Sequence, residues 1–97
     1  MHNIPGNDLL DTPYHINGIA FRIHPNPTKG PVIIEGDVDN HHVILIIRNI
    51  LGKAILCQKL NHNMTEFSLA DNPDGAYFVE IIVDGYSLMR KILKIKD

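Results

Sequence analysis

The sequence contains little cysteine and no long apolar run. Cys57 is the single cysteine among 97 residues, so no internal disulfide can form and a thiolate zinc cage lacks ligands. The apolar neighbourhood of Cys57 favours a buried structural thiol over a nucleophile. The longest apolar run, Val43–Ile47, is far shorter than the roughly 20 residues of a membrane-spanning helix. We therefore expect no disulfide framework and no membrane-spanning segment.

A net positive charge is also missing. The formal net charge is -2 at pH 7 and the isoelectric point is near 6.3, which argues against a nucleic-acid partner. Four of the nine basic residues nevertheless fall in the last eight positions, namely Arg90, Lys91, Lys94 and Lys96. We interpret this cluster as the solvated face of a terminal strand.

Patterns that carry catalysis or tight metal binding are absent as well. Six histidines are present, but His41 and His42 are adjacent, and neighbours on a strand point to opposite faces. Asp37 and Asp39 have part of the spacing of a calcium loop without its distal glutamate, which leaves a weak surface calcium site open. No nucleophile elbow or glycine-rich phosphate loop appears. We predict a protein that is not an enzyme, with no cofactor and no specific metal site.

What the sequence does contain is the material for one folded domain. Its content of 44% apolar and 21% charged residues is ordinary for a globular domain. Residues 1–18 are rich in Asn, Asp, Pro, Gly and His with little periodicity, which predicts a flexible linker or tether. These residues also lack the pattern of a secretory signal, so we expect any export signal to lie on a part upstream. Residues 19–97 form the predicted domain.

Short alternating segments separated by turn residues predict strands throughout this domain. Apolar residues alternate in Ile19–Ile23 and again in Tyr77–Val83, which indicates strands with one buried face. Val43–Ile47 is apolar at every position and strongly β-forming, as in a central strand. Gly52 is predicted to take positive φ in a hairpin turn, and Asp84-Gly85 is the strongest short hairpin signal.

The pattern favours one fold class over its alternatives. About seven short strands with turns roughly every 8 to 12 residues predict an all-β, immunoglobulin-like antiparallel β-sandwich. A small barrel is the alternative fold. Tyr77 shares its parity with Val79 and Ile81, so we assign it to the core or to a tyrosine corner, although a tyrosine can also stack on a sugar.

Four sequence blocks, in this order, resemble a known family. They are Phe21-Arg22-Ile23-His24-Pro25-Asn26-Pro27-Thr28-Lys29-Gly30, Ile47-Arg48-Asn49-Ile50-Leu51-Gly52-Lys53, Asp74-Gly75-Ala76-Tyr77-Phe78-Val79-Glu80-Ile81 and Lys91-Ile92-Leu93-Lys94-Ile95-Lys96. From about Phe21 to Lys96 the chain resembles the C-terminal sorting domain of the type IX secretion system (type A, or Por secretion tail, family). His24 and Asn49 stand where the family often has an aromatic residue and aspartate.

The resemblance implies a function and a set of recognition residues. It implies a sorting signal that directs an upstream, covalently fused cargo through the periplasm to the cell surface, where the signal is cleaved off or exchanged for a lipopolysaccharide anchor. The implied partners are an outer-membrane type IX translocon and a sortase-like peptidase. The implied recognition residues are Pro25, Asn26, Pro27, Thr28, Gly30, Gly52, Gly75, Tyr77, Lys91, Lys94 and Lys96.

The proline-rich block suits such a role for a physical reason. The two prolines that flank Asn26 restrict the loop, so it would lose little entropy when a receptor binds it. The alternative function is an adhesive or carbohydrate-binding sandwich module, because one architecture serves many functions. Cargo, cleavage position, receptor surface and oligomeric state are left open by the sequence.

Overall fold

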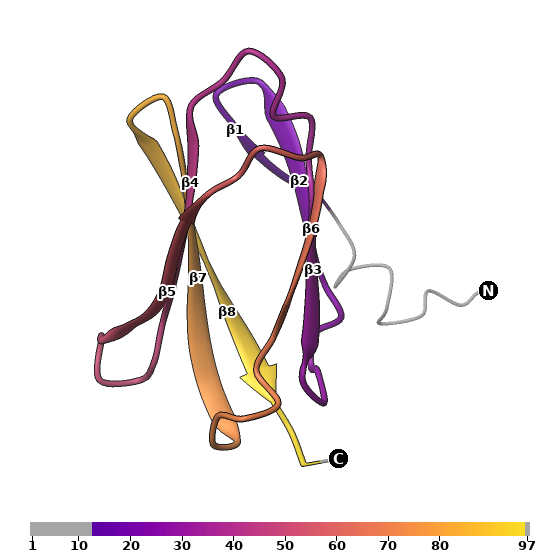
Figure 1. The fold of residues 1–97 in the computed structure, drawn as a ribbon, viewed down its shortest axis with the longest axis vertical. Coiled ribbons are helices and arrows are strands. Elements are labelled where there is room, and N and C mark those ends of the chain that lie inside the picture. The colour runs from indigo at the N-terminus through magenta and orange to yellow at the C-terminus, as the bar shows by residue number, and fades with distance from the viewer. Residues whose placement is uncertain (1–12, 97) are drawn as a thin grey trace, which may run out of the picture.

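The computed structural model describes residues 13–96, and these residues form strands and no helix (Figure 1). The eight strands are β1 (Tyr14–Ile16), β2 (Ile19–His24), β3 (Pro31–Glu35), β4 (Val43–Arg48), β5 (Ala54–Lys59), β6 (Met64–Ser68), β7 (Gly75–Val83) and β8 (Tyr86–Lys94). The part of the chain that is described thus contains no helix that could cross a membrane.

The strands form two stacked layers, which confirms the predicted all-β sandwich. One sheet has the strand order β1-β2-β3-β6 and the other has the order β5-β4-β7-β8, with every neighbouring pair antiparallel. Figure 1 shows the two layers side by side, with β8 ending beside the start of β7. The immunoglobulin-like assignment within this class stays a prediction.

Side chains from the facing sides of the two sheets make one core. Alternate residues of each strand are buried, as in β7, where Tyr77, Val79, Ile81 and Val83 lie inside. This alternation is what a strand with one face toward a core requires. The buried hydrophobic residues are Ile16, Ile19, Phe21, Ile23, Val32, Ile34, Val38, Val43, Leu45, Ile47, Leu60, Phe67, Leu69, Tyr77, Val79, Ile81, Val83 and Ile92.

The described fold begins earlier than the predicted domain boundary, and this adds an eighth strand to the predicted seven. Tyr14–Ile16 pairs with β2 in register, with Ile16 opposite Ile19. The turn between them is Asn17-Gly18, with φ of 47° and 81°. Asn-Gly is a strong hairpin signal. The polar residues around this short strand led to the prediction of a linker there instead. The rest of the predicted linker, residues 1–12, lies outside the described residues.

Strand β4 is central, as predicted, but the prediction for Cys57 is wrong. β4 pairs with β5 on one side and β7 on the other, and Gly52 in the β4–β5 turn has φ of 86°. Cys57 is exposed because it pairs with Ile46, whose side chain lies on the outer face of the sheet. β5 is an edge strand, so its apolar sequence did not guarantee burial.

Candidate recognition end of the sandwich

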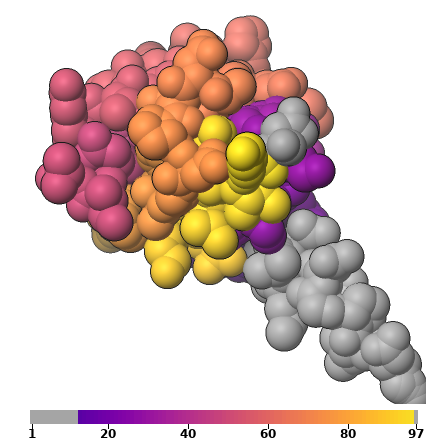
Figure 2. Space-filling model, turned by 90° about the horizontal axis from the view of Figure 1, so that it is seen from below, coloured from indigo at the N-terminus to yellow at the C-terminus, as the bar shows by residue number. Residues whose placement is uncertain are grey.

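The four sequence blocks gather at one end of the sandwich. We call the end of the sandwich where β8 finishes the motif end (Figure 1). At this end lie the proline loop (Pro25–Gly30), the β4–β5 turn (Asn49–Lys53), the start of β7 (Asp74–Tyr77) and the C-terminal block (Lys91–Lys96). Figure 2 looks onto this end, with the yellow C-terminal strand between the orange and purple segments. Blocks separated by many residues thus share one surface.

The proline loop is hydrogen-bonded to the last strand like an additional strand. The Asn26 side chain donates from Nδ2 to the Lys91 carbonyl at 3.0 Å and accepts from the Leu93 amide at Oδ1, also at 3.0 Å. The Thr28 amide donates to the Leu93 carbonyl at 2.9 Å, and the Ile95 amide donates to the Thr28 carbonyl at 2.8 Å. The outer edge of β8 is therefore covered at the motif end, where it would otherwise expose unpaired backbone groups.

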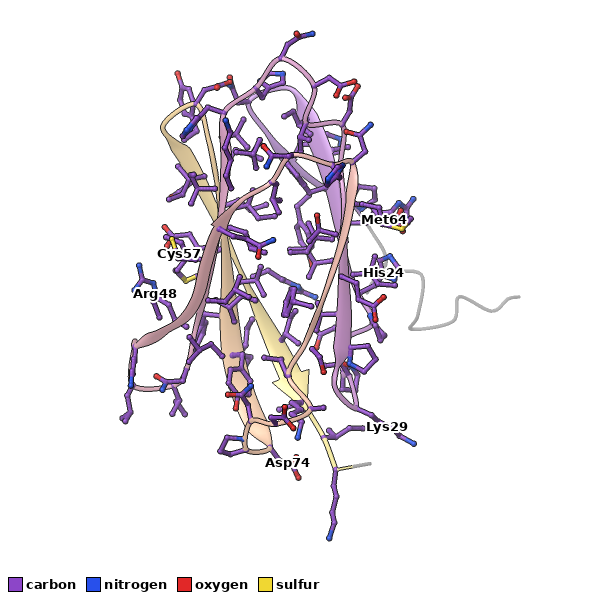
Figure 3. The ribbon with its side chains drawn as sticks, viewed as in Figure 1. His24, Lys29, Arg48, Cys57, Met64 and Asp74 are labelled. Atoms are coloured by element: carbon purple, nitrogen blue, oxygen red, sulfur yellow. The ribbon has the colours of Figure 1, made fainter. Side chains whose placement is uncertain are left out.

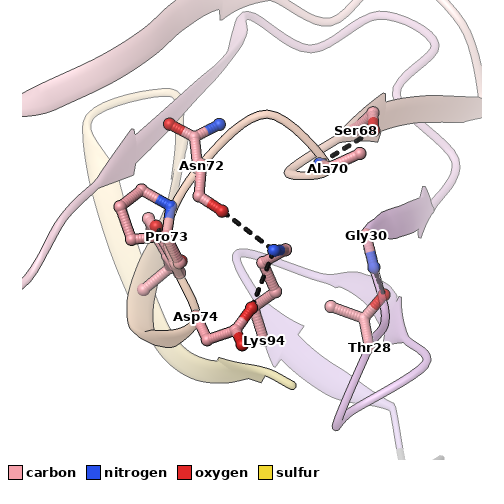
Figure 4. Close-up of polar contacts among 9 residues, drawn as sticks. Thr28, Gly30, Ser68, Ala70, Asn72, Pro73, Asp74 and Lys94 are labelled. Atoms are coloured by element: carbon pink, nitrogen blue, oxygen red, sulfur yellow. Dashed lines mark hydrogen bonds and ion pairs between the residues drawn. The ribbon is translucent and has the colours of Figure 1, made fainter. Parts of the chain in front are cut away.

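Thr28 and Gly30 lie inside the molecule and hold the proline loop in shape. The Thr28 hydroxyl donates to the Pro31 carbonyl and accepts from the Gly30 amide at 3.0 Å, and Thr28 is 1% exposed (Figure 4). Gly30 has φ of 153°, and a Cβ there would lie 3.3 Å from the Cβ of Ala70. The Leu69 amide also donates to the Gly30 carbonyl at 2.8 Å. These contacts explain why the block needs a small residue at this point.

Lys94 is buried, which corrects the prediction of a wholly solvated terminal cluster. Lys94 as a whole is 8% exposed. Its Nζ donates to the Asn72 carbonyl at 2.8 Å and to Asp74 Oδ1 at 2.9 Å (Figure 4). Lys94 alternates with exposed Leu93 and therefore faces the core side of β8. A buried ammonium group needs such partners, because removing a cation from water is costly.

Tyr77 forms the predicted tyrosine corner. Its ring is buried in the core, and its hydroxyl donates to the Pro73 carbonyl at 2.6 Å, four residues upstream. Gly75 opens β7 with φ of 136°. Tyr77 is therefore a structural residue of the β6–β7 connection, and its hydroxyl has a backbone partner within the chain.

The recognition residues implied by the resemblance consequently divide into two groups. Thr28, Gly30, Tyr77 and Lys94 are buried, whereas Pro25, Pro27, Gly52, Lys91 and Lys96 are exposed and Asn26 and Gly75 are half-buried. The first group shapes the motif end, and the second lies on its surface. The side chains of Asn26 and Thr28 form hydrogen bonds within the chain, a role that the sequence did not predict.

The comparison with protein families finds a match over the part of the chain that contains these blocks. A family model described as the secretion system C-terminal sorting domain matches residues 22–96. The matched range contains the end of β2 and the whole of β3 to β8. The chain belongs to this family. No curated protein matches it closely enough to count as a relative. The resemblance to the type IX sorting domain is thereby confirmed.

Membership of the sorting-domain family gives the coarse function. A type IX sorting domain is a signal for protein export, and the family implies a cargo fused upstream that is delivered to the cell surface or the extracellular space. Domains of this family are generally not catalytic. Within residues 13–96 no group of three or more His, Cys, Asp and Glu side chains is arranged to hold a metal ion.

The opposite end of the sorting domain is tied together by Asp84. Its Oδ2 accepts from Asn17 Nδ2 at 3.1 Å and lies 2.7 Å from His41 Nδ1, and its Oδ1 accepts from the His42 amide at 3.0 Å. The hydrogen bond with the His41 side chain, helped by the His42 amide, lowers the pKa of Asp84. Three loops are thus joined, although the sequence marked Asp84 only as a turn residue.

Two other residues singled out in the sequence have partners within the chain. Asp37 Oδ1 accepts from the Asp39 amide at 3.2 Å, which is a local turn contact. His24 Nε2 lies 3.0 Å from Glu35 Oε1 on the outer face of the β1-β2-β3-β6 sheet. Of the six aromatic residues in the sequence, Tyr86 is exposed, and Tyr14 and Phe78 are half-buried.

Proposed function

We propose that this domain is the signal by which the outer-membrane translocon of a type IX system recognises and exports an upstream cargo. The translocon reads the motif end of the domain after the cargo has passed through the periplasm. The exposed residues of the proline loop and of the C-terminal block form the surface that is read, and the buried residues hold that surface in one conformation.

One observation supports this assignment most strongly. The Asn26 side chain joins the proline loop to the C-terminal block through hydrogen bonds with the backbone of Lys91 and Leu93. These partners lie 65 and 67 residues further along the chain. A receptor that contacts this end meets both blocks together. Because the loop is already ordered, binding costs little conformational entropy.

We further propose that a sortase-like peptidase then removes the domain and transfers the cargo to a lipopolysaccharide anchor. In this scheme the domain supplies a recognition surface and no catalytic group. The described residues are consistent with this division, because the acids outside ion pairs lie mainly in turns and the buried polar residues have structural partners.

The decisive experiment is a fusion of this domain behind a signal peptide and a fluorescent reporter, expressed in a bacterium with an intact type IX system. We expect the reporter at the cell surface, with a mobility shift that marks lipopolysaccharide attachment. Deletion of Lys91–Asp97 should abolish export, because it removes the C-terminal half of the motif end. The reporter itself should stay fluorescent.

The controls separate recognition from folding. The same fusion in a strain without the translocon should remain in the periplasm. A double variant of the exposed Lys91→Ala and Lys96→Ala should slow export while the unfolding transition of the domain is unchanged, since both side chains are exposed. Periplasmic retention of the unaltered fusion in the competent strain would contradict the proposed function.

A further inference from the structure

The outer face of the β5-β4-β7-β8 sheet is apolar, unlike the outer face of the other sheet. The register of the strands places six large apolar side chains on it, namely Ile44, Ile46, Phe78, Ile82, Met89 and Leu93. We call these residues the apolar face. All of them are half-buried or exposed, and no other described segment packs over them as a third layer. Figure 3 shows Arg48 and Cys57 on this side, opposite Met64 and His24.

The β4–β5 turn extends this face with two apolar side chains that point into solvent. Ile50 is 73% exposed and Leu51 is 90% exposed. Between the turn and the sheet lies a depression of about 240 Å³ lined by Arg48, Asn49, Ile50, Gly52, Phe78 and Met89. A protruding leucine thus lies beside an apolar hollow, and adjoining exposed apolar residues of this kind mark interaction sites.

The turn holds Leu51 outward by a dense set of hydrogen bonds. Asn49 Oδ1 accepts from the amides of Leu51 and Lys53, each at 3.0 Å, and the Gly52 amide donates to the Asn49 carbonyl at 2.9 Å. Arg48 Nη1 donates to the Gly52 carbonyl at 3.2 Å. The exposed side chains are therefore presented by an ordered turn, which lowers the entropy that binding would cost.

The charges around this face are mainly positive. Lys53, Lys59 and Lys91 are exposed in the turn or on the same side of the sheet. The register puts one acid on the sheet face, Glu80. Glu80 Oε1 lies 3.6 Å from Arg48 Nη2, so the negative charge of Glu80 is paired with a positive charge. A second acid, Asp74, lines a hollow beside Leu51 and is paired with Lys94. The face is cationic although the chain has a net charge of -2. It is complementary to an acidic partner and repels a second copy of itself.

From these observations we infer that the apolar face and the Ile50-Leu51 turn dock into an apolar groove with an acidic rim on a protein of the export machinery. The inference rests on the proposed function and names a contact surface that adjoins the C-terminal block and shares Lys91 and Leu93 with it. A protein fits better than a lipid bilayer. Its surface can offer a recess that receives Leu51 and a projecting side chain that fills the neighbouring hollow. Docking of Leu51 would place it at the buried centre of the contact.

The experiment uses the exported reporter fusion with a photo-crosslinking amino acid at position 51, and at position 64 as the matched control. Met64 is 61% exposed but lies on the other sheet. We expect a crosslink from position 51 to an outer-membrane protein of the export machinery, at about ten times the yield from position 64. Mass spectrometry should map it to an apolar site flanked by acidic residues, and added salt should reduce the yield.

Substitutions provide the second readout. Leu51→Asp should slow export about ten-fold, and Met64→Asp should leave the rate unchanged, with equal unfolding midpoints for both variants. Lys53→Glu combined with Lys91→Glu should slow export more than the corresponding glutamine pair. Normal export of Leu51→Asp would overturn the docking surface while the proposed function stands, and failure of the unaltered fusion to be exported would overturn both.

Other occupants give distinguishable results, each of which overturns the inference. Equal crosslinking of the purified domain to itself at position 51 would identify a second copy as the occupant. Binding of the purified domain to phosphatidylglycerol vesicles, lost in Leu51→Asp, together with no protein crosslink, would identify an anionic membrane.

Discussion

Lys94 on the last strand reaches across the motif end to Asp74, where its Nζ lies 2.9 Å from Asp74 Oδ1. The contact joins the C-terminal block to the block that begins β7, and the same nitrogen donates to the Asn72 carbonyl. The Lys94 side chain is 9% exposed, and that of Asp74 is 48% exposed. One cation thus holds together two sequence blocks that are 20 residues apart.

Replacing Lys94 should weaken the fold measurably. Lys94→Ala removes the donor to the Asn72 carbonyl and leaves a buried site without its cation, so we expect a loss of about 1–3 kcal/mol in the free energy of unfolding. Urea denaturation measures it. Lys91→Ala, at an exposed position of the same strand, serves as the control and should change stability by less than about 0.5 kcal/mol. Equal effects of the two variants would contradict a structural role for Lys94.

Removing the Asn26 side chain should open the edge of β8. Asn26→Ala deprives the Lys91 carbonyl and the Leu93 amide of their partner, and we expect a loss of about 1–2 kcal/mol. Hydrogen exchange gives the specific signal, because the Leu93 amide should lose protection while amides of β4 keep theirs. Lys29→Ala, an exposed change in the same loop, should leave Leu93 protected; if it also exposes Leu93, the Asn26 bonds are not the cause.

A methyl group at position 36 should disturb the core. A Cβ on Gly36 would lie 2.5 Å from Cδ1 of Phe21, whose ring is fully buried. We expect Gly36→Ala to cost about 1–3 kcal/mol through this overlap. In a Phe21→Leu background the additional cost should be smaller, because the ring is gone. A strictly additive double-mutant cycle would show that the ring contact does not explain the effect.

The tyrosine corner should contribute a single hydrogen bond to stability. Tyr77→Phe keeps the buried ring but removes the hydroxyl that donates to the Pro73 carbonyl, so we expect a loss of about 1 kcal/mol. Thermal or urea unfolding measures the change. Tyr86→Phe, at a position that is 63% exposed, should have no effect and provides the matched comparison. No loss in Tyr77→Phe would mean that water replaces the hydroxyl without cost.

The Asp84 cluster should give stability that depends on pH in a defined direction. Because the His41 and His42 hydrogen bonds lower the pKa of Asp84 in the folded state, its contribution is complete above the unfolded pKa, close to 4, and is lost as pH falls through the lower folded pKa. The difference in stability between Asp84→Asn and the unaltered domain should therefore be present at about pH 5 and shrink as the pH falls below about 4. A difference that grows on acidification would refute this assignment.

Local patterns in the sequence were sufficient to predict most strands and several turns. The alternation in Ile19–Ile23 and Tyr77–Val83 reports the side of a sheet that meets a core, and Asp84-Gly85 forms the predicted turn with φ of 50° and 91°. These features depend on neighbouring residues alone. Periodicity therefore predicts the layers, because each strand must bury one of its two faces.

Features that depend on distant partners were not predictable in the same way. Lys94 is buried because Asn72 and Asp74 supply oxygen atoms from another segment, and nothing in its own neighbours indicates this. Cys57 is exposed because β5 became an edge strand with that residue on its outer side. The sequence blocks indicate which segments form the motif end, but the hydrogen bonds between these segments could be identified only from the structure.

The bonds between the proline loop and β8 also constrain the order of folding. They join residues near position 26 to residues near position 92, so forming them closes a loop of more than 60 residues. Because closing a long loop costs more entropy than closing a hairpin, we expect these bonds to form after the local hairpins. A nascent chain that has not yet delivered its final strand cannot complete this joint. Formation of these hydrogen bonds therefore reports that the domain has been synthesised through β8 and has folded.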